Sequence, residues 1–407
     1  MLIVLKTQLF DKLIHRQFMF TIFRLIISIV VFLISLLAVF RAPTNFCWKI
    51  SILLTEYSYV FIILFSLPLF SHWWLSKSGV ASAIFSLIAL GFAISPLLRA
   101  IPVINNLPDQ VKNAFAIEPS LIISKNNFRR YPFVFYDSIL GINKPPITLE
   151  KLCYKKTSET TETALDLNFY HSVSKDRKSP CILVIHGGGW NGGDKEQLSA
   201  LNFYLAGQGY SVASIEYRLA PKNVFPAPVE DTKDAIKYIK DHSERLKVDT
   251  SNLILLGRSA GGQIALLTAY ISNDPSIKGV ISFYAPADMV WGYSMPGNPL
   301  ILDSRLVMEQ YLGGTYNKVP QVFKASSPNE FVSKNCPPTL LIHGIRDEMV
   351  SYEHSRRLDL LLETAGVKHL LVTLPWATHG CDYNFNGPSG QISTFAIERF
   401  IASVTKQ

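Results

Sequence analysis

The chain has 407 residues and a formal net charge of +8, and 48% of its residues are hydrophobic while only 17% are charged. This length suits one large domain with additional segments, and the apolar composition indicates that part of the chain lies in lipid. The positive charge fits either a basic solvated surface or contact with anionic lipid headgroups. No zinc-finger spacing, aromatic-basic RNA signature or concentrated basic helix occurs, so we expect no nucleic-acid partner.

Three apolar stretches fill most of the first hundred residues. Residues 25–40 and 78–98 carry no charge, and residues 50–70 carry only Glu56. Because about 20 apolar residues in a helix cross the hydrocarbon layer, we expect residues 1–98 to form a membrane region with about three transmembrane helices. Buried helices of a soluble protein are the alternative for all three stretches, and a cleaved signal peptide is an alternative for the first one alone.

The basic residues around these spans indicate on which side of the membrane the rest of the chain lies. The residues before the first span favour a cytoplasmic N-terminus, and three crossings would then place the remainder outside the cytoplasm; they are Lys6, Lys12, Arg16 and Arg24. A second basic group after the third span opposes this orientation; it comprises Arg99, Lys112, Lys125, Arg129 and Arg130. The sequence therefore predicts a multi-pass membrane protein and favours the extracytoplasmic side only slightly.

The pattern changes twice after the apolar region. Residues 99–147 carry six prolines and no sustained hydrophobic period, so we expect a connector. From residue 148 to residue 407, short apolar runs alternate with helical patterns, which predicts an α/β sheet covered by helices with its chemistry at the carboxyl ends of the strands. The runs that read as strands are 164–172, 181–187, 211–218, 253–257, 279–284, 338–344 and 369–375, and the clearest helical patterns are 230–246 and 354–366.

A serine stands at one of these strand-to-helix junctions. Residues 257–261 read Gly-Arg-Ser-Ala-Gly, a G-x-S-x-G pattern after a predicted strand and before a predicted helix. This is the arrangement of a nucleophile elbow, in which Gly257 and Gly261 leave room for a sharp turn that exposes Ser259 above the sheet. An idle serine in a tight turn is the alternative.

A glycine run after an earlier strand supplies candidate oxyanion donors. Residues 186–190 read His-Gly-Gly-Gly-Trp, and we assign the backbone N–H groups of Gly188 and Gly189, with that of Ala260, to an oxyanion hole. A phosphate-binding loop is the alternative, but it would require Lys-Ser or Lys-Thr directly after the glycines.

A serine nucleophile needs a base and a carboxylate that orients the base. Asp347 follows the predicted strand at 338–344, and His379 follows the strand at 369–375, which gives the chain order Ser, Asp, His expected for this fold. Glu348 is the competing carboxylate. We expect His186 and His343 to hold loops and not to act as the base.

Residues 148–404 resemble the α/β-hydrolase superfamily, and within it the hormone-sensitive-lipase-like carboxylesterases and the BD-FAE (feruloyl-esterase-like) group. The resemblance rests on the segments HGGGW, EYRLAPKNVFPAPVEDTKDAIKYI, VDTSNLILLGRSAGG, PPTLLIHGIRDEMV and THGCDYNF. It implies a mostly parallel eight-stranded sheet and ester hydrolysis without a cofactor, and it supports the Ser259–Asp347–His379 triad. Arg258 departs from the acidic residue usual before the nucleophile in the hormone-sensitive-lipase branch, which favours the BD-FAE branch.

The combined prediction is a membrane-anchored serine hydrolase that cleaves a small-molecule or lipid ester through an acyl-enzyme, without cofactor or metal. An amide or peptide hydrolase, an acyltransferase, a catalytically silent receptor or scaffold, and a transporter are the alternatives. We expect residues 289–330 to cap the acyl site with their aromatic side chains, and Asp288 to be a helix N-cap. The acyl and alcohol specificity and the oligomeric state stay open.

Overall fold

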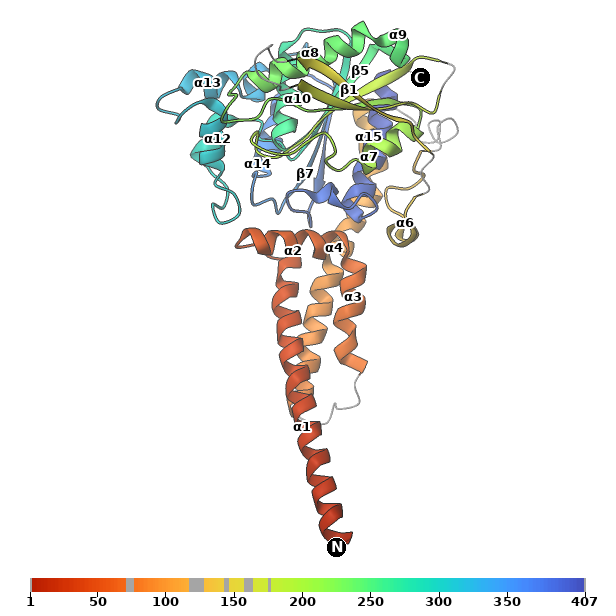
Figure 1. Ribbon diagram of the computed structural model, residues 1–407, viewed down its shortest axis with the longest axis vertical. Coiled ribbons are helices and arrows are strands. Elements are labelled where there is room, and N and C mark those ends of the chain that lie inside the picture. Colours follow the sequence, from red (N-terminus) through yellow and green to blue (C-terminus); the bar gives the residue numbers. More distant parts are fainter. Residues whose placement is uncertain are drawn as a thin grey trace.

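The computed structural model of the chain describes residues 2–70, 77–116, 128–142, 146–156, 164–174 and 177–405. Two parts of the predicted connector, residues 117–127 and 143–145, lie outside the described residues. The described chain consists of a bundle of N-terminal helices and a layered sheet domain that stands on one end of this bundle, with the N-terminus at the far end (Figure 1).

The sheet domain has the predicted α/β-hydrolase architecture. Its single sheet contains eight strands in the order β1-β2-β4-β3-β5-β6-β7-β8, of which β1, β2 and β4 pair antiparallel and the remaining neighbours pair parallel. The strands are β1 (Leu149–Lys156), β2 (Ala164–Tyr170), β3 (Ser179–Ile185), β4 (Ser211–Ile215), β5 (Val248–Arg258), β6 (Ile277–Phe283), β7 (Thr339–Gly344) and β8 (His369–Leu374). The sequence pattern had indicated all of them except β1, whose lysines and half-exposed side chains are those of an edge strand.

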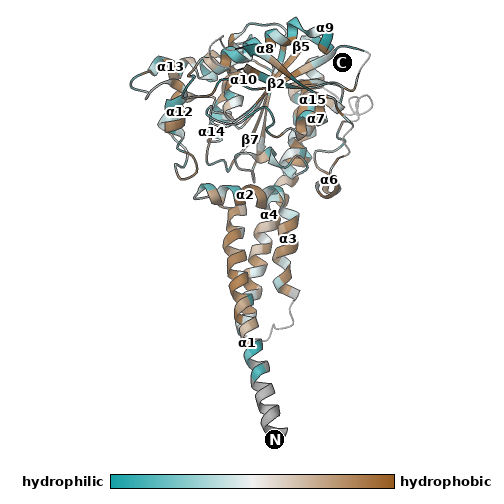
Figure 2. Ribbon diagram, viewed as in Figure 1, coloured by the Kyte–Doolittle hydropathy of each residue, from teal (hydrophilic) through white to brown (hydrophobic). Residues whose placement is uncertain are grey.

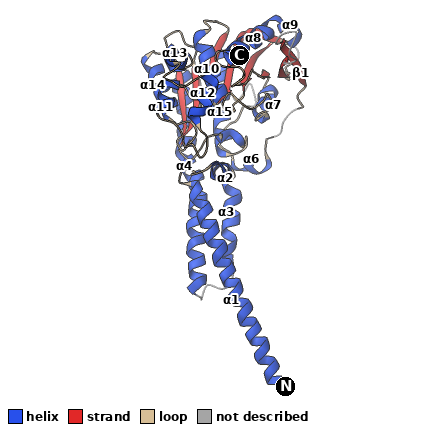
Figure 3. Cartoon of the chain, turned by 60° about the vertical axis from the view of Figure 1, so that its left-hand side comes forward, coloured by secondary structure: helices blue, strands red, loops and turns tan. Residues whose placement is uncertain are grey.

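Helices cover both faces of this sheet (Figure 3). Because β3, β5 and β6 are buried almost completely, their successive side chains enter two separate cores. One core contains residues of α8 (Ala227–Asp241), α10 (Ala260–Ile271) and α14 (Glu353–Thr364), and the other contains residues of α7 (Ala200–Gly207) and α15 (Pro388–Thr405). The shorter helices are α6 (Phe135–Leu140), α9 (Ser243–Leu246), α11 (Met289–Ser294), α12 (Ser304–Leu312) and α13 (Pro320–Ala325).

Among the described residues, two N-terminal helices are long and apolar enough to cross a membrane. They are the segment Phe18–Ala38, which includes most of α1 (Leu2–Ser35), and α4 (Lys77–Phe115). Hydrophobic residues predominate along the ribbon of the bundle below α2 (Figure 2). A third crossing exists only if the bent pair α2 (Asn45–Glu56) and α3 (Ser58–Ser66) forms one span.

The second apolar stretch, residues 50–70, is not the single straight helix that its hydropathy predicts. The chain bends by 91° between α2 and the following helical segment, so α2 lies across the end of the bundle, directly beneath the sheet domain (Figure 1). The bend follows from contacts with that domain: buried Glu56 accepts hydrogen bonds from the hydroxyl and the N–H of Ser389, at 2.6 and 3.1 Å. These contacts outweigh the tendency of an apolar run to continue as one helix.

The first part of the predicted connector is also helical. Residues 99–115 continue α4 into the sheet domain, although Pro96, Pro102 and Pro108 lie inside the helix. Leu107, Val111 and Phe115 are buried in the core that contains α7 and α15. Packing of this apolar face compensates for the backbone hydrogen bonds that the proline rings remove.

Candidate active site

Ser259 stands in a strained turn between β5 and α10. Its backbone has φ 52° and ψ −120°, a left-handed conformation that is unfavourable for any residue except glycine. A Cβ atom on Gly257 would lie 2.1 Å from the carbonyl oxygen of Gly261, and one on Gly261 would lie 2.2 Å from that of Ile185. Only glycines fit these two positions, and the turn that they permit places Ser259 at the N-terminal end of α10.

The structure brings Ser259, His379 and Asp347 together. Nε2 of His379 lies 3.0 Å from Oγ of Ser259, and Nδ1 lies 2.7 Å from Oδ2 of Asp347. These residues come from three segments, the β5–α10 turn and the loops after β7 and β8, and they meet at the carboxyl edge of the sheet. With Nδ1 donating to the carboxylate, Nε2 can accept the hydroxyl proton of the serine.

Asp347 is held as an ionised acceptor. Its Oδ1 accepts hydrogen bonds from the N–H groups of Met349 and Val350, both at 2.9 Å. Burial alone would raise the pKa of Asp347, but the facing His379 and the hydrogen bonds from His343 and His379 hold that pKa well below its ordinary value. His343 in turn is fixed by Ser355 Oγ at 2.7 Å and by the carbonyl of Val350 at 3.0 Å, as a loop-holding histidine should be.

Glu348, the competing carboxylate, faces a different set of partners. Its side chain accepts hydrogen bonds from the N–H of Ala42, at 2.8 Å, and from the hydroxyl of Thr378. Burial raises the pKa of Glu348, and the nearby Asp347 charge adds to the effect. Glu348 therefore joins the sheet domain to the N-terminal region, while Asp347 contacts the histidine.

The glycine run after β3 adopts conformations that other residues avoid. Gly188 has φ 120° and Gly189 has φ 59°, and a Cβ atom on Gly188 would lie 2.3 Å from the carbonyl oxygen of Gly192. Gly188 and Gly189 line one pocket with Ser259, and Gly189 and Ala260 line an adjoining pocket with Ser259. The three residues assigned to the oxyanion hole thus surround the serine.

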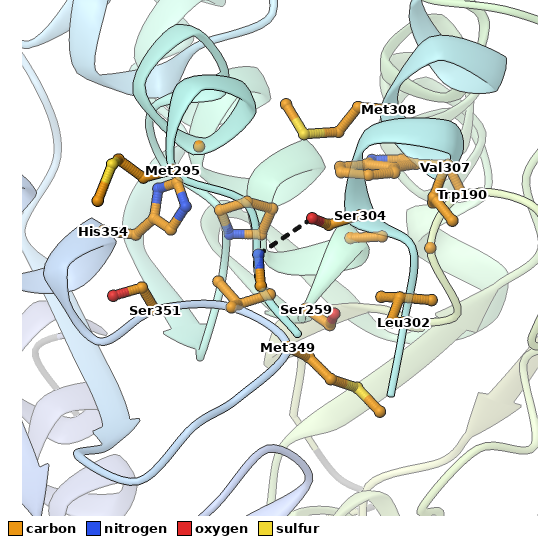
Figure 4. A pocket seen from close by; sticks show the side chains of 16 residues that line it. Trp190, Ser259, Met295, Leu302, Ser304, Val307, Met308, Met349, Ser351 and His354 are labelled. Atoms are coloured by element: carbon orange, nitrogen blue, oxygen red, sulfur yellow. Dashed lines mark hydrogen bonds between the residues drawn. The ribbon is translucent and has the colours of Figure 1, made fainter. Parts of the chain in front are cut away.

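Two pockets of different size meet at Ser259. The smaller has a volume of about 40 Å³ and is lined mainly by apolar and methionine side chains, with His354 and Ser351 on one side and Ser304 closer to Trp190 (Figure 4). The larger has a volume of about 380 Å³, and His379, Tyr284 and Tyr383 line it together with Trp48 and Ile52 of α2. Ser259 therefore faces a confined pocket and a spacious pocket.

The segment 289–330 approaches the site in a different way from the prediction. Its contribution to the small pocket comes from aliphatic and methionine side chains, namely Met295, Leu302, Val307 and Met308. The aromatic side chains pack elsewhere: Tyr293 contacts Phe323, with ring centroids 5.0 Å apart, and Tyr311 stacks on Trp190 at 4.5 Å. The predicted N-cap is confirmed, because Oδ1 of Asp288 accepts the N–H of Trp291 at 2.9 Å.

An ion pair behind the histidine was missed by the sequence analysis. Buried Arg258 donates from Nε to Oδ2 of Asp382 at 2.5 Å, and the hydroxyl of Tyr284 donates to the other carboxylate oxygen at 2.6 Å. The Tyr284 ring also packs on the imidazole of His379, with centroids 4.5 Å apart. Arg258 therefore ties the strand that carries the nucleophile to the loop that carries the histidine.

Trp48 and Ile52 were also missed, since Ile52 belongs to the apolar stretch 50–70 that predicts a membrane span and Trp48 stands just before it. Nε1 of Trp48 donates to the carbonyl oxygen of His379 at 3.1 Å. The only sequence signal for this contact is that both side chains stand on one face of a helix, four residues apart. Within the described residues, no group of three or more His, Cys, Asp or Glu side chains could hold a metal ion.

Comparisons with known proteins cover the sheet domain. Residues 167–362 match the BD-FAE family. Esterase LipC of Mycobacterium tuberculosis is 30% identical over 51% of this chain and 54% of its own length, and Esterase LipQ of the same organism is 27% identical over 54% of this chain and 55% of its own length. This chain thus spans about half the length of the curated relatives that it matches.

A solved structure shows the same fold. The structure of a bacterial heroin esterase covers 66% of this chain with a TM-score of 0.56 and 24% identity, and 90% of that protein is matched. Residues 167–362 are therefore a BD-FAE domain on an α/β-hydrolase fold, and the chain is homologous to carboxylic ester hydrolases.

Proposed function

We propose that this protein is a membrane-anchored serine hydrolase that cleaves carboxylic esters. The observation that carries the proposal is the pair of contacts made by His379, 3.0 Å to the hydroxyl of Ser259 and 2.7 Å to the carboxylate of Asp347. Homology to carboxylesterases supports an ester as the bond that is attacked.

The chemistry follows from this geometry. Nε2 of His379 takes the proton of Ser259 as Oγ attacks the ester carbonyl, and Asp347 stabilises the imidazolium that forms. The N–H groups of Gly188, Gly189 and Ala260 donate hydrogen bonds that stabilise the tetrahedral oxyanion. His379 then protonates the leaving alcohol, and a water molecule repeats the sequence on the acyl-enzyme and releases the acid.

The apolar N-terminal helices support the proposed anchoring of the protein in a membrane. Two to three N-terminal helices could cross a membrane, and the N-terminus lies at the opposite end of the bundle from the sheet domain (Figure 1). With the basic residues Lys12 and Arg16 in the cytoplasm, the sheet domain would lie outside it. Labelling of exposed Cys153 by an impermeant maleimide in intact spheroplasts tests this side; labelling only after lysis would place the domain in the cytoplasm.

The decisive experiment compares the full chain with Ser259→Ala in detergent, with p-nitrophenyl acetate as substrate. We expect the substitution to lower kcat on the order of 10⁶-fold, because the nucleophile of a triad acts as a unit with its base. A fluorophosphonate probe should label the wild type and leave the variant unlabelled. Equal turnover by both proteins would refute Ser259 as the nucleophile. A folded wild type that neither turns over nor reacts with the probe would refute ester hydrolysis and favour a silent scaffold. Faster cleavage of the matching anilide would favour an amidase.

A further inference from the structure

The spacious pocket is completed by the N-terminal region. Trp48 and Ile52 stand one helical turn apart on the face of α2 that meets the sheet domain, and both line the pocket that contains Ser259 and His379. Ile52 is only 7% exposed, and Trp48 is tied to the carbonyl of His379. The active site of this chain therefore has a wall that the BD-FAE match at residues 167–362 does not include.

The proposed chemistry fixes which half of the ester enters which pocket. The leaving alcohol must lie beside Nε2 of His379, since that atom returns the proton to the alcohol oxygen. His379 lines the spacious pocket, whereas the confined pocket is lined by Ser259 and Ala260 without it. The alcohol therefore occupies the side with Trp48 and Ile52, and the acyl group occupies the side with Trp190 and Met308.

The two volumes then set the size of each half. The acyl side offers about 40 Å³, far less than the alcohol side, which suits a short acyl chain. The alcohol side offers about 380 Å³. A substrate that fills both pockets has a short acyl group and a large alcohol.

The position of α2 indicates where this alcohol comes from. The helix begins a few residues after the apolar segment Phe18–Ala38 ends and lies across that end of the bundle, so it is at the level of the lipid headgroups (Figure 1). Its outer face exposes Phe46 by 71% and Leu53 by 41%. Nearby, α6 exposes Tyr136 by 67% and Leu140 by 62%, and the hydroxyl of Tyr59 ties this helix to α3 through the carbonyl of Ser138, at 2.8 Å. The pocket wall is thus one face of a helix whose other face suits the membrane interface.

We propose that α2 forms the wall of the leaving-group subsite and that the substrate is a short-chain acyl ester of a long-chain alcohol held in the membrane. This inference rests on the proposed ester hydrolysis. It makes Ile52 and Trp48 specificity-determining residues of the site.

The first test compares two isomeric esters with the full wild-type chain in phosphatidylcholine nanodiscs. Dodecyl acetate has the long chain on its alcohol, and ethyl dodecanoate has it on its acid, while the two share composition and overall hydrophobicity. We expect kcat/KM to be about tenfold or more higher for dodecyl acetate, because a long acyl chain does not fit the confined pocket. Preference for ethyl dodecanoate, or equal rates, would overturn the inference. Preference for soluble 2-phenylethyl acetate over dodecyl acetate would overturn the membrane source of the alcohol.

A second test changes the wall itself. Ile52→Trp fills the alcohol side and should lower the ratio of kcat/KM for dodecyl acetate to that for ethyl acetate by about tenfold. Leu53→Trp, the matched substitution at the neighbouring exposed position, should leave that ratio unchanged. Equal ratios in both variants would contradict the assignment of α2. If Ile52→Trp fails to react with the fluorophosphonate probe, Ile52→Ala replaces it. Because this substitution enlarges the alcohol side, it should raise the ratio above that of the wild type, and an unchanged ratio would contradict the assignment of α2.

The two proposals fail in distinguishable ways. Absence of p-nitrophenyl acetate hydrolysis by the wild type refutes ester hydrolysis itself. Serine-dependent hydrolysis of p-nitrophenyl acetate without any preference between the isomers refutes only the subsite.

Discussion

Ser259 and its two partners in the proposed triad are supported by different parts of the molecule. Ser259 follows β5, which pairs with β3 and β6 near the middle of the sheet, so its position depends on the core of the sheet domain. Asp347 and His379 lie on loops after β7 and β8, at the side of the sheet that rests on the N-terminal bundle. The N-terminal region thus supports two of the three positions of the proposed triad.

Three hydrogen-bonded contacts carry this support. The N–H of Ala42 meets Glu348, the residue after the proposed acid, and Trp48 meets the carbonyl of His379. Just before the first of these contacts along both segments, the guanidinium of Arg346 donates to the carbonyl oxygens of Leu37, Ala38 and Phe40. The bundle therefore has a structural role at the site in addition to any role as an anchor.

Of the substitutions considered below, we expect Arg346→Ala to reduce the stability of the protein most. Arg346 is 5% exposed, and burial lowers its pKa to about 10, so it stays charged at neutral pH while it caps these carbonyls. Removal of a charged donor from several buried acceptors should lower the free energy of unfolding by about 3 kcal/mol. Thermal unfolding in detergent measures the loss. Exposed Arg41, with one contact of 3.5 Å to the carbonyl of Ile345, is the control, and Arg41→Ala should change stability by less than about 0.5 kcal/mol. Similar losses for both variants would mean that Arg346 does not join the two regions.

The next effect is confined to the sheet domain and depends on pH. His354 is buried beside the small pocket, and this burial, with the positive charge of nearby side chains, lowers its pKa from 6.5 to about 3. Above pH 6.5, His354 is neutral in the folded and the unfolded protein. As the pH falls from 6.5 toward the folded-state pKa, the histidine of the unfolded chain binds a proton while that of the folded protein does not, so the free energy of unfolding decreases. Between pH 7 and pH 5 the wild type should lose about 2 kcal/mol more than His354→Gln.

Denaturant unfolding at the two pH values provides the measurement for His354. His171→Gln, at a partly exposed position in the same domain, controls for the loss of a histidine. A wild type and a His354→Gln variant with the same pH dependence would show that His354 is protonated with little penalty in the folded protein.

The smallest expected effect tests whether the bundle acts on the chemistry. Trp48→Phe keeps an aromatic wall but removes the N–H that holds the carbonyl of His379. The loss of one hydrogen bond of about 1 kcal/mol should lower kcat for ethyl acetate about fivefold, with KM unchanged, since the base is less well positioned. Lys49→Gln, on the exposed side of the same helix, should leave kcat unchanged. A fall in affinity with unchanged kcat would make Trp48 a wall residue only.

Much of the sheet domain could be predicted because its signals are local. The fold class and the family resemblance are confirmed. The glycines around Ser259 and in residues 187–189 stand where the local backbone leaves no room for a side chain or has a positive φ, and such positions can be recognised from a short stretch of sequence. The catalytic roles of Ser259, Asp347 and His379, with Gly188, Gly189 and Ala260 as oxyanion donors, stay predictions, although the structure places these residues around one point.

The features that sequence analysis missed depend on partners far away along the chain. The bend after α2 depends on the contact of Glu56 with Ser389, and the wall of the alcohol pocket depends on the contact of Trp48 with His379, 331 residues later. The helical continuation through Pro102 and Pro108 depends on a core that forms only when α15 is in place. Hydropathy and proline counts describe single segments, so they contain no information about contacts between segments that are far apart in the sequence.

The last turns of α4 have a practical consequence for anyone who wishes to separate the hydrolase from its bundle. The ring of Phe115 packs 5.1 Å from that of Phe400 in α15, and Leu107 and Val111 are fully covered by the sheet domain. A shortened protein that starts at residue 148 would expose this hydrophobic seam to water and would tend to aggregate. A soluble version has to retain the segment that begins near Ala100, because the domain boundary lies inside a continuous helix.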